Sequence, residues 1–335
     1  MLILGIETSC DETAAAVVED GRRILSSVVA SQVDIHHQFG GVVPELASRK
    51  HIEAIVPVVQ QALTEANTGP ELLDAVAATQ GPGLVGALLV GFSFAKAYAY
   101  ACRLPLVAMD HLEGHLYSAL LGDAPAAFPY VALLASGGHT GIYAVAGRGN
   151  YQLLGQTRDD AAGEAYDKVA KMLGLGYPGG AIIDDLARQG DASKIVFTRP
   201  YLDKERFDFS FSGIKSAVLR CISNKSSQWV ERHRADIAAG FQAAVVDVLV
   251  HKLLYAAEIM RCRHVAVVGG VAANQGLRGR LAREAARREL ALHVPPINLC
   301  GDNAAMIAAA AHHRMADGQF ASLRDDVYSR HRRTC

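Results

Sequence analysis

A strand-turn-strand pattern that occurs twice is the feature of this sequence that most limits its fold. Residues 2–7 and 14–18 are two apolar runs joined by a turn rich in hydroxyl and acidic groups. The same order recurs over residues 130–145, around the small polar turn at 136–140. Each segment is typical of a β-hairpin. Because each hairpin opens one half of the chain, we predict a duplicated fold, although two unrelated hairpins would give the same pattern.

A later glycine segment indicates which duplicated fold this is. An apolar run at residues 265–270 ends in two glycines, and residues 271–274 then open a helix. Glycine lets a backbone approach a ligand closely, and amides at a helix start can bind phosphate or ribose. In actin, Hsp70 and sugar kinases, two hairpins that bind phosphate are followed by a later strand whose glycine-rich end binds adenosine. The segments of this sequence occur in the same order. We therefore predict an α/β protein with the two-lobed actin/Hsp70/sugar-kinase-like (ASKHA) nucleotide-binding fold and a duplicated core.

Apolar periodicity in the rest of the chain predicts strands alternating with helices, as in sheets covered by helices. Further strands are expected at residues 24–31, 74–79, 106–110, 151–156, 264–269 and 291–295. Helices are expected at residues 43–66, 85–102, 111–121, 161–174, 181–189, 211–222, 227–260, 273–289 and 302–316. We expect the first lobe at residues 1–110 and the second at 111–301, with a closing helix near 302–320 that crosses back onto the first.

Two histidines four residues apart, His111 and His115, are candidate metal ligands. One helical turn separates them, so both imidazoles can face one ion. Asp302, at the start of an alanine-rich helix, adds a carboxylate, and such a set leaves coordination positions open on zinc or ferrous iron. Packed or solvent-exposed histidines would give the same spacing. In a zinc-protease helix the general base is a glutamate directly after the first histidine, whereas Glu113 comes later in this motif. A metal-dependent endopeptidase is therefore the second hypothesis and not the first.

Composition limits the partners and the compartment. The formal net charge is only −1, which lacks the basic field of a free-standing nucleic-acid binder. Nucleic-acid contact must therefore come from a local patch or a partner protein. The amino terminus has no basic segment of a signal peptide, and we expect no segment long enough to span a membrane. The six cysteines lack paired spacing, which favours a reducing cytoplasm.

Eight short motifs occur in order between residues 3 and 312. They are ETSCDET at 7–13, GVVPE and ASR within 41–49, HLEGH at 111–115, SGGHT at 136–140, GEAYDK at 163–168, YPGG at 177–180, FSFSGIK at 209–215 and GGVAAN at 269–274. This set resembles the TsaD family, formerly described as O-sialoglycoprotein endopeptidases. Tyr166, Ala181 and Gly301 stand where Phe, Pro and Thr are more common in that family. Since Gly301 adjoins Asp302, the hydrogen bonding around that carboxylate can differ from the family pattern.

The resemblance implies a transferase that moves the threonylcarbamoyl group from threonylcarbamoyl-AMP to N6 of adenosine 37, 3′ of the anticodon, in tRNAs reading ANN codons. It implies one Fe²⁺ or Zn²⁺ ion on His111, His115 and Asp302. The substrate and nucleotide contacts that it implies are Leu134, Ala135, Ser136, Gly137, Gly138, Asp167, Gly180, Asp184 and Asn274. The implied partners are tRNA, an inactive paralogue (TsaB), an ATPase subunit (TsaE) and the TsaC-type enzyme that supplies the adenylate, with ATP or ADP as a further ligand.

The residue types suit that chemistry. An acyl-adenylate is already activated, so the protein must orient the carbonyl and the amine and stabilise developing charge. Asp11 and Glu12, at the tip of the first hairpin, are the candidates to accept the amine proton. Lys215 is a candidate contact for phosphate or RNA, and packing by its neighbouring phenylalanines is the alternative. A non-catalytic, nucleotide-gated scaffold of the Hsp70 type is the third hypothesis.

Overall fold

The computed structural model describes residues 1–122, 124–201 and 206–330. The chain forms two compact units, one of Met1–Pro125 with Gly301–Cys335 and one of Ala126–Cys300. The expected boundary after residue 110 lies inside the first unit. The helix that begins at His111 packs against the last helix of the chain, and both belong to that unit.

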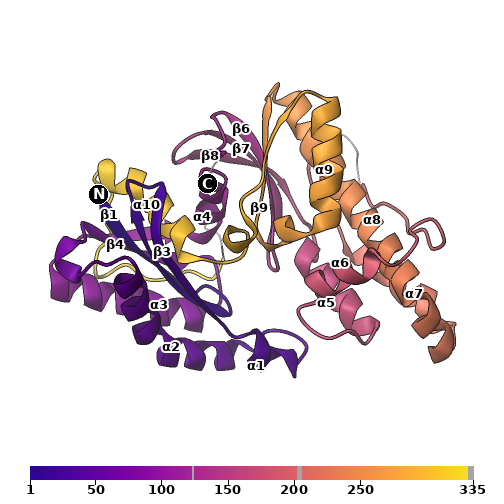
Figure 1. Ribbon diagram of the computed structural model, residues 1–335, viewed down its shortest axis with the longest axis horizontal. Coiled ribbons are helices and arrows are strands. Elements are labelled where there is room, and N and C mark those ends of the chain that lie inside the picture. The colour runs from indigo at the N-terminus through magenta and orange to yellow at the C-terminus, as the bar shows by residue number, and fades with distance from the viewer. Residues whose placement is uncertain (123, 202–205, 331–335) are drawn as a thin grey trace. The chain divides into compact units, whose positions relative to one another are not determined.

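The first unit is built on a five-stranded sheet with the order β3-β2-β1-β4-β5 (Figure 1). Its strands are β1 (Leu2–Glu7), β2 (Glu12–Glu19), β3 (Arg23–Ser31), β4 (Ala75–Gly81) and β5 (Leu106–Asp110). The first three strands pair antiparallel, whereas β4 and β5 run parallel to β1. Its helices are α1 (Val33–His37), α2 (Pro44–Glu65), α3 (Val85–Cys102), α4 (His111–Ser118) and α10 (Ala304–Ala316), with a 3-10 turn η1 (Pro70–Leu72).

One face of this sheet packs on α2 and α3. Leu4, Ile6 and Val17 are buried there together with Ile55 of α2 and Phe92 of α3. Alternate residues of a strand point to opposite faces, so the other side chains of these strands need a second layer. That layer is α10, which packs on β1 and β2.

Gly5 lets α10 lie close to the sheet. A Cβ at this position would lie 2.4 Å from the carbonyl oxygen of Ala304 and 2.9 Å from the Cβ of Ala308. Only a residue without a side chain fits such an approach. The close packing holds the start of α10, and with it the segment that carries Asp302.

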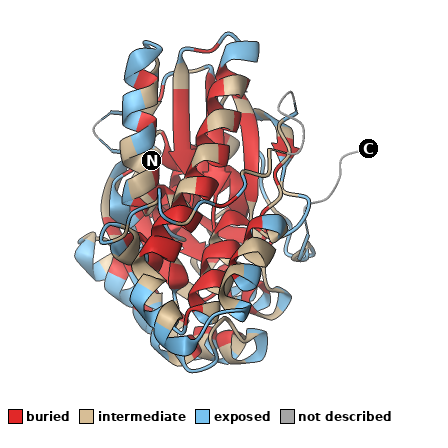
Figure 2. Cartoon of the chain, turned by 90° about the vertical axis from the view of Figure 1, so that its right-hand side faces the viewer, coloured by how far each residue is buried: buried red, intermediate tan, exposed pale blue. Residues whose placement is uncertain are grey.

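The second unit repeats the sheet, with the order β10-β9-β6-β7-β8. Its strands are β6 (Tyr130–Ala135), β7 (Thr140–Gly147), β8 (Asn150–Gln156), β9 (His264–Val268) and β10 (Ala291–His293). Its helices are α5 (Ala162–Met172), α6 (Gly179–Ala187), α7 (Ser212–Ser223), α8 (Ser227–Ile259) and α9 (Gln275–Arg287), with 3-10 turns η2 (Gly270–Ala273) and η3 (Ile297–Leu299). Strands β6, β7 and β9 are largely buried, whereas the edge strands β8 and β10 are mostly exposed or half-buried; buried residues are red in Figure 2.

The two sheets have the same topology. In each, an antiparallel three-stranded meander is followed by two strands that run parallel to its first strand. The duplicated core predicted from the two hairpins is therefore confirmed, and so is the mixed α/β class. All the predicted strands and helices are present, with shifted ends.

Two local features differ from the expected elements. The short helix α1 was not predicted, because five residues are too few to show a helical period. The helix expected at 273–289 begins later, at Gln275 after the 3-10 turn η2, since the Asn274 side chain accepts a hydrogen bond from the amide of Leu277 and starts α9 there.

Two helices are long and apolar enough to cross a membrane by length and composition, contrary to the expectation that none would be. They are Val85–Cys102 (α3) and a window in Ser227–Ile259 (α8). The α8 window is 83% buried inside the protein, whereas the α3 window is 33% buried. Core helices pass the same test, so these two are weak evidence for membrane insertion.

Candidate metal centre and nucleotide turn

Helix α4 brings two imidazoles to one place in the first unit. The helix follows β5 directly, and Asp110 caps it by accepting hydrogen bonds from the amides of Leu112 and Glu113 at 2.8 and 3.1 Å. His111 is its first residue and His115 lies one turn later, both buried. The cap thus sets the direction in which the two histidines leave the helix.

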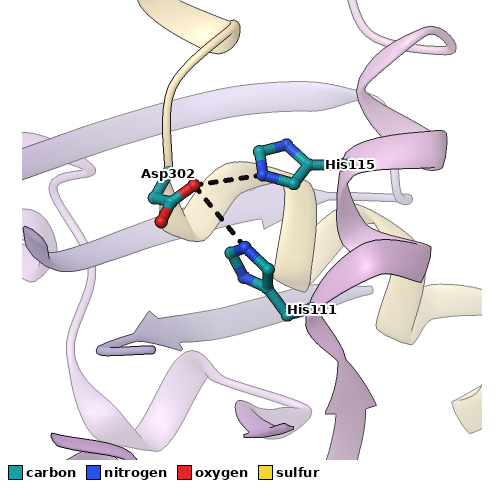
Figure 3. Close-up of side chains that lie close together, drawn as sticks. All are labelled: His111, His115 and Asp302. Atoms are coloured by element: carbon teal, nitrogen blue, oxygen red, sulfur yellow. Dashed lines mark hydrogen bonds and ion pairs between the residues drawn. The ribbon is translucent and has the colours of Figure 1, made fainter. Parts of the chain in front are cut away.

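Asp302 completes the trio. His115 Nε2 lies 3.0 Å and His111 Nε2 lies 3.6 Å from Asp302 Oδ1. One donor atom from each of the three residues lies within 4.8 Å of the others, and Figure 3 shows all three side chains directed at one point. The predicted trio is therefore brought together by the fold.

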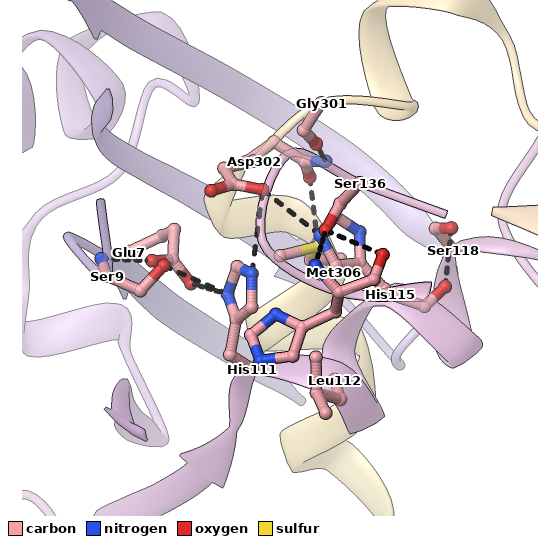
Figure 4. Close-up of polar contacts among 12 residues, drawn as sticks. Glu7, Ser9, His111, Leu112, His115, Ser118, Ser136, Gly301, Asp302 and Met306 are labelled. Atoms are coloured by element: carbon pink, nitrogen blue, oxygen red, sulfur yellow. Dashed lines mark hydrogen bonds and ion pairs between the residues drawn. The ribbon is translucent and has the colours of Figure 1, made fainter. Parts of the chain in front are cut away.

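A buried carboxylate orients His111 from its other side (Figure 4). Glu7 Oε2 lies 3.1 Å from His111 Nδ1 and also accepts a hydrogen bond from the hydroxyl of Thr79. The Ser9 hydroxyl lies 3.1 Å from the same imidazole nitrogen. A carboxylate on one nitrogen of a histidine, with the other nitrogen aimed at a common point, is the usual support of a metal ligand. Sequence analysis missed Glu7, because its role depends on a contact 104 residues away in the chain.

The charges around the trio favour a cation. Burial lowers the pKa of His111, but the charges of Asp302 and Glu7 outweigh it and raise that pKa to about 9. Burial, followed by the charges of Asp302 and Asp11, raises the pKa of Glu12 well above its usual range. A carboxyl group whose pKa is raised by neighbouring negative charges is relieved by a positive ion beside it.

The donor set fits a divalent transition metal. Two imidazole nitrogens and one carboxylate oxygen match both zinc and ferrous iron, and three protein ligands leave positions open for other ligands. Glu7 supplies the outer support for one histidine. His115 Nδ1 is buried and has no hydrogen-bond partner among the described residues, so this ring has no outer support like that of Glu7 on His111.

Asp11 is the last residue of the turn between β1 and β2 and is buried, and Glu12 is the half-buried first residue of β2. The turn is held by His51 of α2, whose imidazole nitrogens lie 2.7 Å from the Thr13 hydroxyl and 2.9 Å from the Cys10 carbonyl oxygen. Asp302 influences the pKa of Glu12, which places the two acids in the electrostatic surroundings of the trio.

Glu113 has a structural partner instead of a place at the metal centre. Its carboxylate accepts a hydrogen bond from the Arg314 guanidinium, and His313 Nε2 lies 3.4 Å from it. The side chain is 1% exposed. An acid that is committed to a buried ion pair on another face of α4 does not serve as the base of a peptidase.

The second hairpin forms an open glycine turn in the second unit. The Ser136 amide donates to the carbonyl of His139 at 2.8 Å, which closes the turn, and the Gly163 amide of α5 donates to the Ser136 carbonyl at 3.1 Å. A Cβ built on Gly137 or Gly138 would meet no atom within 4 Å. A ligand can therefore approach this backbone closely. Leu134 and Ala135 precede the turn in β6 and are fully buried.

The polar residues predicted to contact the nucleotide fall into two local networks. Asp167 accepts a hydrogen bond from the Gly179 amide at 2.7 Å, beside Gly180 at the start of α6. Asp184 accepts from the Gln275 amide at 2.8 Å and thereby supports the start of α9.

Gln242 joins Asp184 to Asn274. Its amide nitrogen donates to Asp184 Oδ1 at 2.9 Å, and its amide oxygen accepts from Asn274 Nδ2 at 2.7 Å. Gln242 could not be predicted, because one glutamine among the several polar residues of the long helix α8 gives no local signal. Its burial reveals it, since a buried amide needs partners for both of its ends.

Lys215 is committed to an ion pair. Its Nζ lies 2.6 Å from Asp160, whose other oxygen lies 2.7 Å from Lys168 Nζ. Asp159 accepts hydrogen bonds from the amides of Phe211 and Ser212 at the start of α7. The FSFSGIK motif is thus tied to the loop before α5 through this ion pair and these amides.

Comparison with known proteins identifies the family. Residues 23–309 match the model of the TsaD family, described as tRNA N6-adenosine threonylcarbamoyltransferase. The chain belongs to the TsaD family. Its similarity to relatives of that name extends over nearly its whole length. It is 59% identical to the protein of Desulforapulum autotrophicum, covering 99% of both chains, and 55% identical to one from Anaeromyxobacter dehalogenans, covering 95% of this chain and 96% of that one.

Solved structures show the fold beyond the TsaD family. HypF from T. kodakarensis superposes with a TM-score of 0.64 at 14% identity, covering 95% of this chain and 48% of that one. Component A of (R)-2-hydroxyglutaryl-CoA dehydratase from Acidaminococcus fermentans gives 0.56 at 17% identity, covering 94% and 99%. At these identities the likeness supports the predicted ASKHA fold and nothing about substrates.

Proposed function

We propose that this protein transfers the threonylcarbamoyl group from threonylcarbamoyl-AMP to N6 of adenosine 37 in tRNAs that read ANN codons. The observation that carries the proposal is the His111, His115 and Asp302 trio, supported by Glu7, in a chain of the TsaD family. The family and its relatives are named for this tRNA-modifying transfer.

In the first unit, His111, His115 and Asp302 would hold one Fe²⁺ or Zn²⁺ ion. A bound ion of this kind supplies Lewis-acid polarisation of a carbonyl oxygen. Glu7 keeps His111 oriented through Nδ1, so that Nε2 stays directed at the point where the three donors meet.

Asp11 and Glu12 are our candidates for the group that takes the proton from the incoming amine. The charge of Asp302 contributes to the raised pKa of Glu12, which supports a position for Glu12 beside the trio. His51 holds their turn in place from α2.

In the second unit, the turn Ser136–Gly138 would receive the phosphate of the adenylate on backbone amides, as its open glycines allow. Leu134 and Ala135 would position this turn. Asp167 and Gly180 would contact the substrate from the start of α6. Asp184 and Asn274, joined by Gln242, would form the nucleotide contact at the start of α9. ATP or ADP would use the same contacts.

The endopeptidase hypothesis fits less well, because the acid that it needs, Glu113, is buried in an ion pair with Arg314. The scaffold hypothesis accounts for the open glycine turn but leaves the metal trio without a purpose. Both remain distinguishable from transfer by their products.

For tRNA recognition we propose partner proteins in the cytoplasm. A net charge of −1 provides little long-range attraction for a polyanion. By resemblance, the partners are the paralogue TsaB and the ATPase TsaE, and a TsaC-type enzyme supplies the adenylate.

The test is incubation of the purified protein with labelled threonine, bicarbonate, ATP, tRNA and the adenylate-forming enzyme, with and without TsaB and TsaE. We expect label in tRNA only with all the partners present. Cleavage of a glycoprotein without labelled tRNA would favour the endopeptidase. Nucleotide binding with neither product would favour the scaffold.

A further inference from the structure

The segment that follows α10 runs along the edge of the first sheet (Figure 1, yellow). We call residues 321–328 the C-terminal strap. The Ala321 amide donates to the carbonyl of Leu106 in the edge strand β5 at 2.7 Å. Further along, the Tyr328 amide donates to the carbonyl of Gln80 in β4 at 3.1 Å. Backbone hydrogen bonds therefore hold the strap at both of its ends.

Side chains of the unit also hold the middle of the strap. The Gln80 amide nitrogen donates to the carbonyl of Asp326 at 2.8 Å, and the Lys96 ammonium of α3 donates to the carbonyl of Asp325. Val327 packs against the core shared by the sheet, α2 and α3. The strap is thus part of the first unit.

The strap ends on the cap of the metal-bearing helix. The Tyr328 hydroxyl donates to Asp110 Oδ2 at 2.8 Å, while Oδ1 of the same carboxylate accepts from the amides that start α4. Asp110 is 7% exposed. Tyr328 therefore supplies a donor to a nearly buried carboxylate whose other oxygen starts the helix.

The lack of a side chain at Gly81 is a second feature that lets the end of the strap pack on the first unit. A Cβ at this position would lie 2.1 Å from the carbonyl oxygen of Tyr328 and 2.7 Å from its ring. Any larger residue would displace the end of the strap. The glycine thus allows the backbone and ring of Tyr328 to lie against the end of β4.

We propose that Tyr328 is a positioning residue for the metal centre and acts through Asp110. The hydroxyl holds the carboxylate in the rotamer that caps α4, and the cap sets the directions of His111 and His115. Without it, Asp110 loses a charge-assisted hydrogen bond and gains freedom to rotate. This inference rests on the proposed metal centre, and it adds a residue 217 positions beyond the first histidine to the support of that centre.

The test substitutes Tyr328→Phe and titrates Co²⁺ and Zn²⁺ against the full-length protein. We expect cation affinity to fall about tenfold, as for the loss of an outer partner of a metal ligand. The absorption bands of bound Co²⁺ should shift, because they report the arrangement of the ligands. The thermal midpoint of the cation-free protein should fall by only about a few degrees, because one hydrogen bond is lost and the fold is kept. Tyr100→Phe is the matched control, since it removes a hydroxyl from a 74% exposed tyrosine of α3 in the same unit.

A double-mutant cycle tests the route through Asp110. Asp110→Asn keeps an oxygen that can cap α4, so we expect Tyr328→Phe to have little further effect in that background. Additive effects, or wild-type Co²⁺ affinity and spectrum in folded Tyr328→Phe protein, would overturn the positioning role alone. If the wild-type protein binds no Co²⁺, or if His111→Ala leaves its Co²⁺ binding unchanged, the metal centre itself is rejected, and both proposals with it.

Discussion

The two units share a sheet topology, yet their first hairpin turns differ in packing and in charge. In the first unit α3 lies close to the turn, since a Cβ on Gly83 would lie 2.5 Å from the Ser9 carbonyl and one on Gly91 would lie 2.1 Å from the Thr8 hydroxyl. In the second unit α5 also approaches the turn from one side, since a Cβ on Gly163 would lie 2.6 Å from the Ser136 carbonyl oxygen, but Gly137 and Gly138 are exposed and a Cβ built on either would meet no atom within 4 Å. One turn is enclosed and the other is open.

The difference in charge follows the difference in packing. The enclosed turn begins after Glu7 and carries Asp11 and Glu12, so its unit gathers carboxylates around two histidines. The open turn carries only small residues and His139, and presents backbone instead of charge. We therefore propose a cation site in one copy of the scaffold and an anion-binding turn in the other. Duplication preserves the strand order, whereas the residues outside the shared strands differ between the copies.

The largest expected effect belongs to the cation site alone. His111→Ala, His115→Ala and Asp302→Ala should each abolish near-stoichiometric metal binding and lower transfer by about a thousandfold or more, because three ligands are the minimum set of an open site. AMP affinity, a property of the second unit, should stay unchanged. Elemental analysis, calorimetry and the transfer assay measure these effects. Wild-type metal content in the Asp302 variant would contradict the three-ligand site.

Substitution of Glu113 tests whether this acid stabilises the first unit or takes part in metal binding and catalysis. Glu113→Ala should destabilise the first unit by about 3 kcal/mol, because it leaves Arg314 without its buried carboxylate. Glu113→Gln keeps the side-chain volume and serves as the milder control, and it should retain both metal and transfer activity. Urea unfolding gives the free energy. Loss of transfer with full metal content and stability in the Gln variant would instead indicate a catalytic acid.

Substitutions in the nucleotide contacts of the second unit should change AMP affinity and leave the metal centre unaffected. Asp167→Ala, Asn274→Ala and Gln242→Leu should each weaken AMP binding by about 1–2 kcal/mol, because each removes buried hydrogen bonds of the nucleotide contacts. Metal content should not change. Gln228→Leu, at an exposed position of α8, is the control for the glutamine variant. Calorimetry with unchanged AMP affinity in all three variants would remove this network from the site.

The smallest expected effect depends on pH and concerns the enclosed turn. Burial lowers the pKa of His51, so the folded state favours the neutral ring. The neutral ring of His51 should contribute about 1 kcal/mol to the free energy of unfolding. This contribution should be fully present above the unfolded pKa of about 6.5, and be lost as the pH falls through the lower pKa of the folded state. Chemical unfolding of wild type and His51→Gln between pH 5 and 8 measures it. Equal pH dependence in the two proteins would exclude His51 as the source.

Local pattern determined most of the elements and the members of the metal trio. The hairpins and long helices were predictable because a strand period or a helical period repeats within a few residues, and His111 and His115 were predictable because one helical turn joins them. The sequence motifs also indicated the glycine turn, since glycine shows where a backbone must approach another group.

Only the tertiary structure decided which distant residues support these sites. Glu7 orients His111, Gln242 joins Asp184 to Asn274, and Tyr328 contacts Asp110 across long separations in the chain. It also supplied the partners of two other residues, since Glu113 pairs with Arg314 and Lys215 pairs with Asp160. A hydrogen bond between distant segments leaves no period in the sequence, because packing of the whole unit determines which side chains meet.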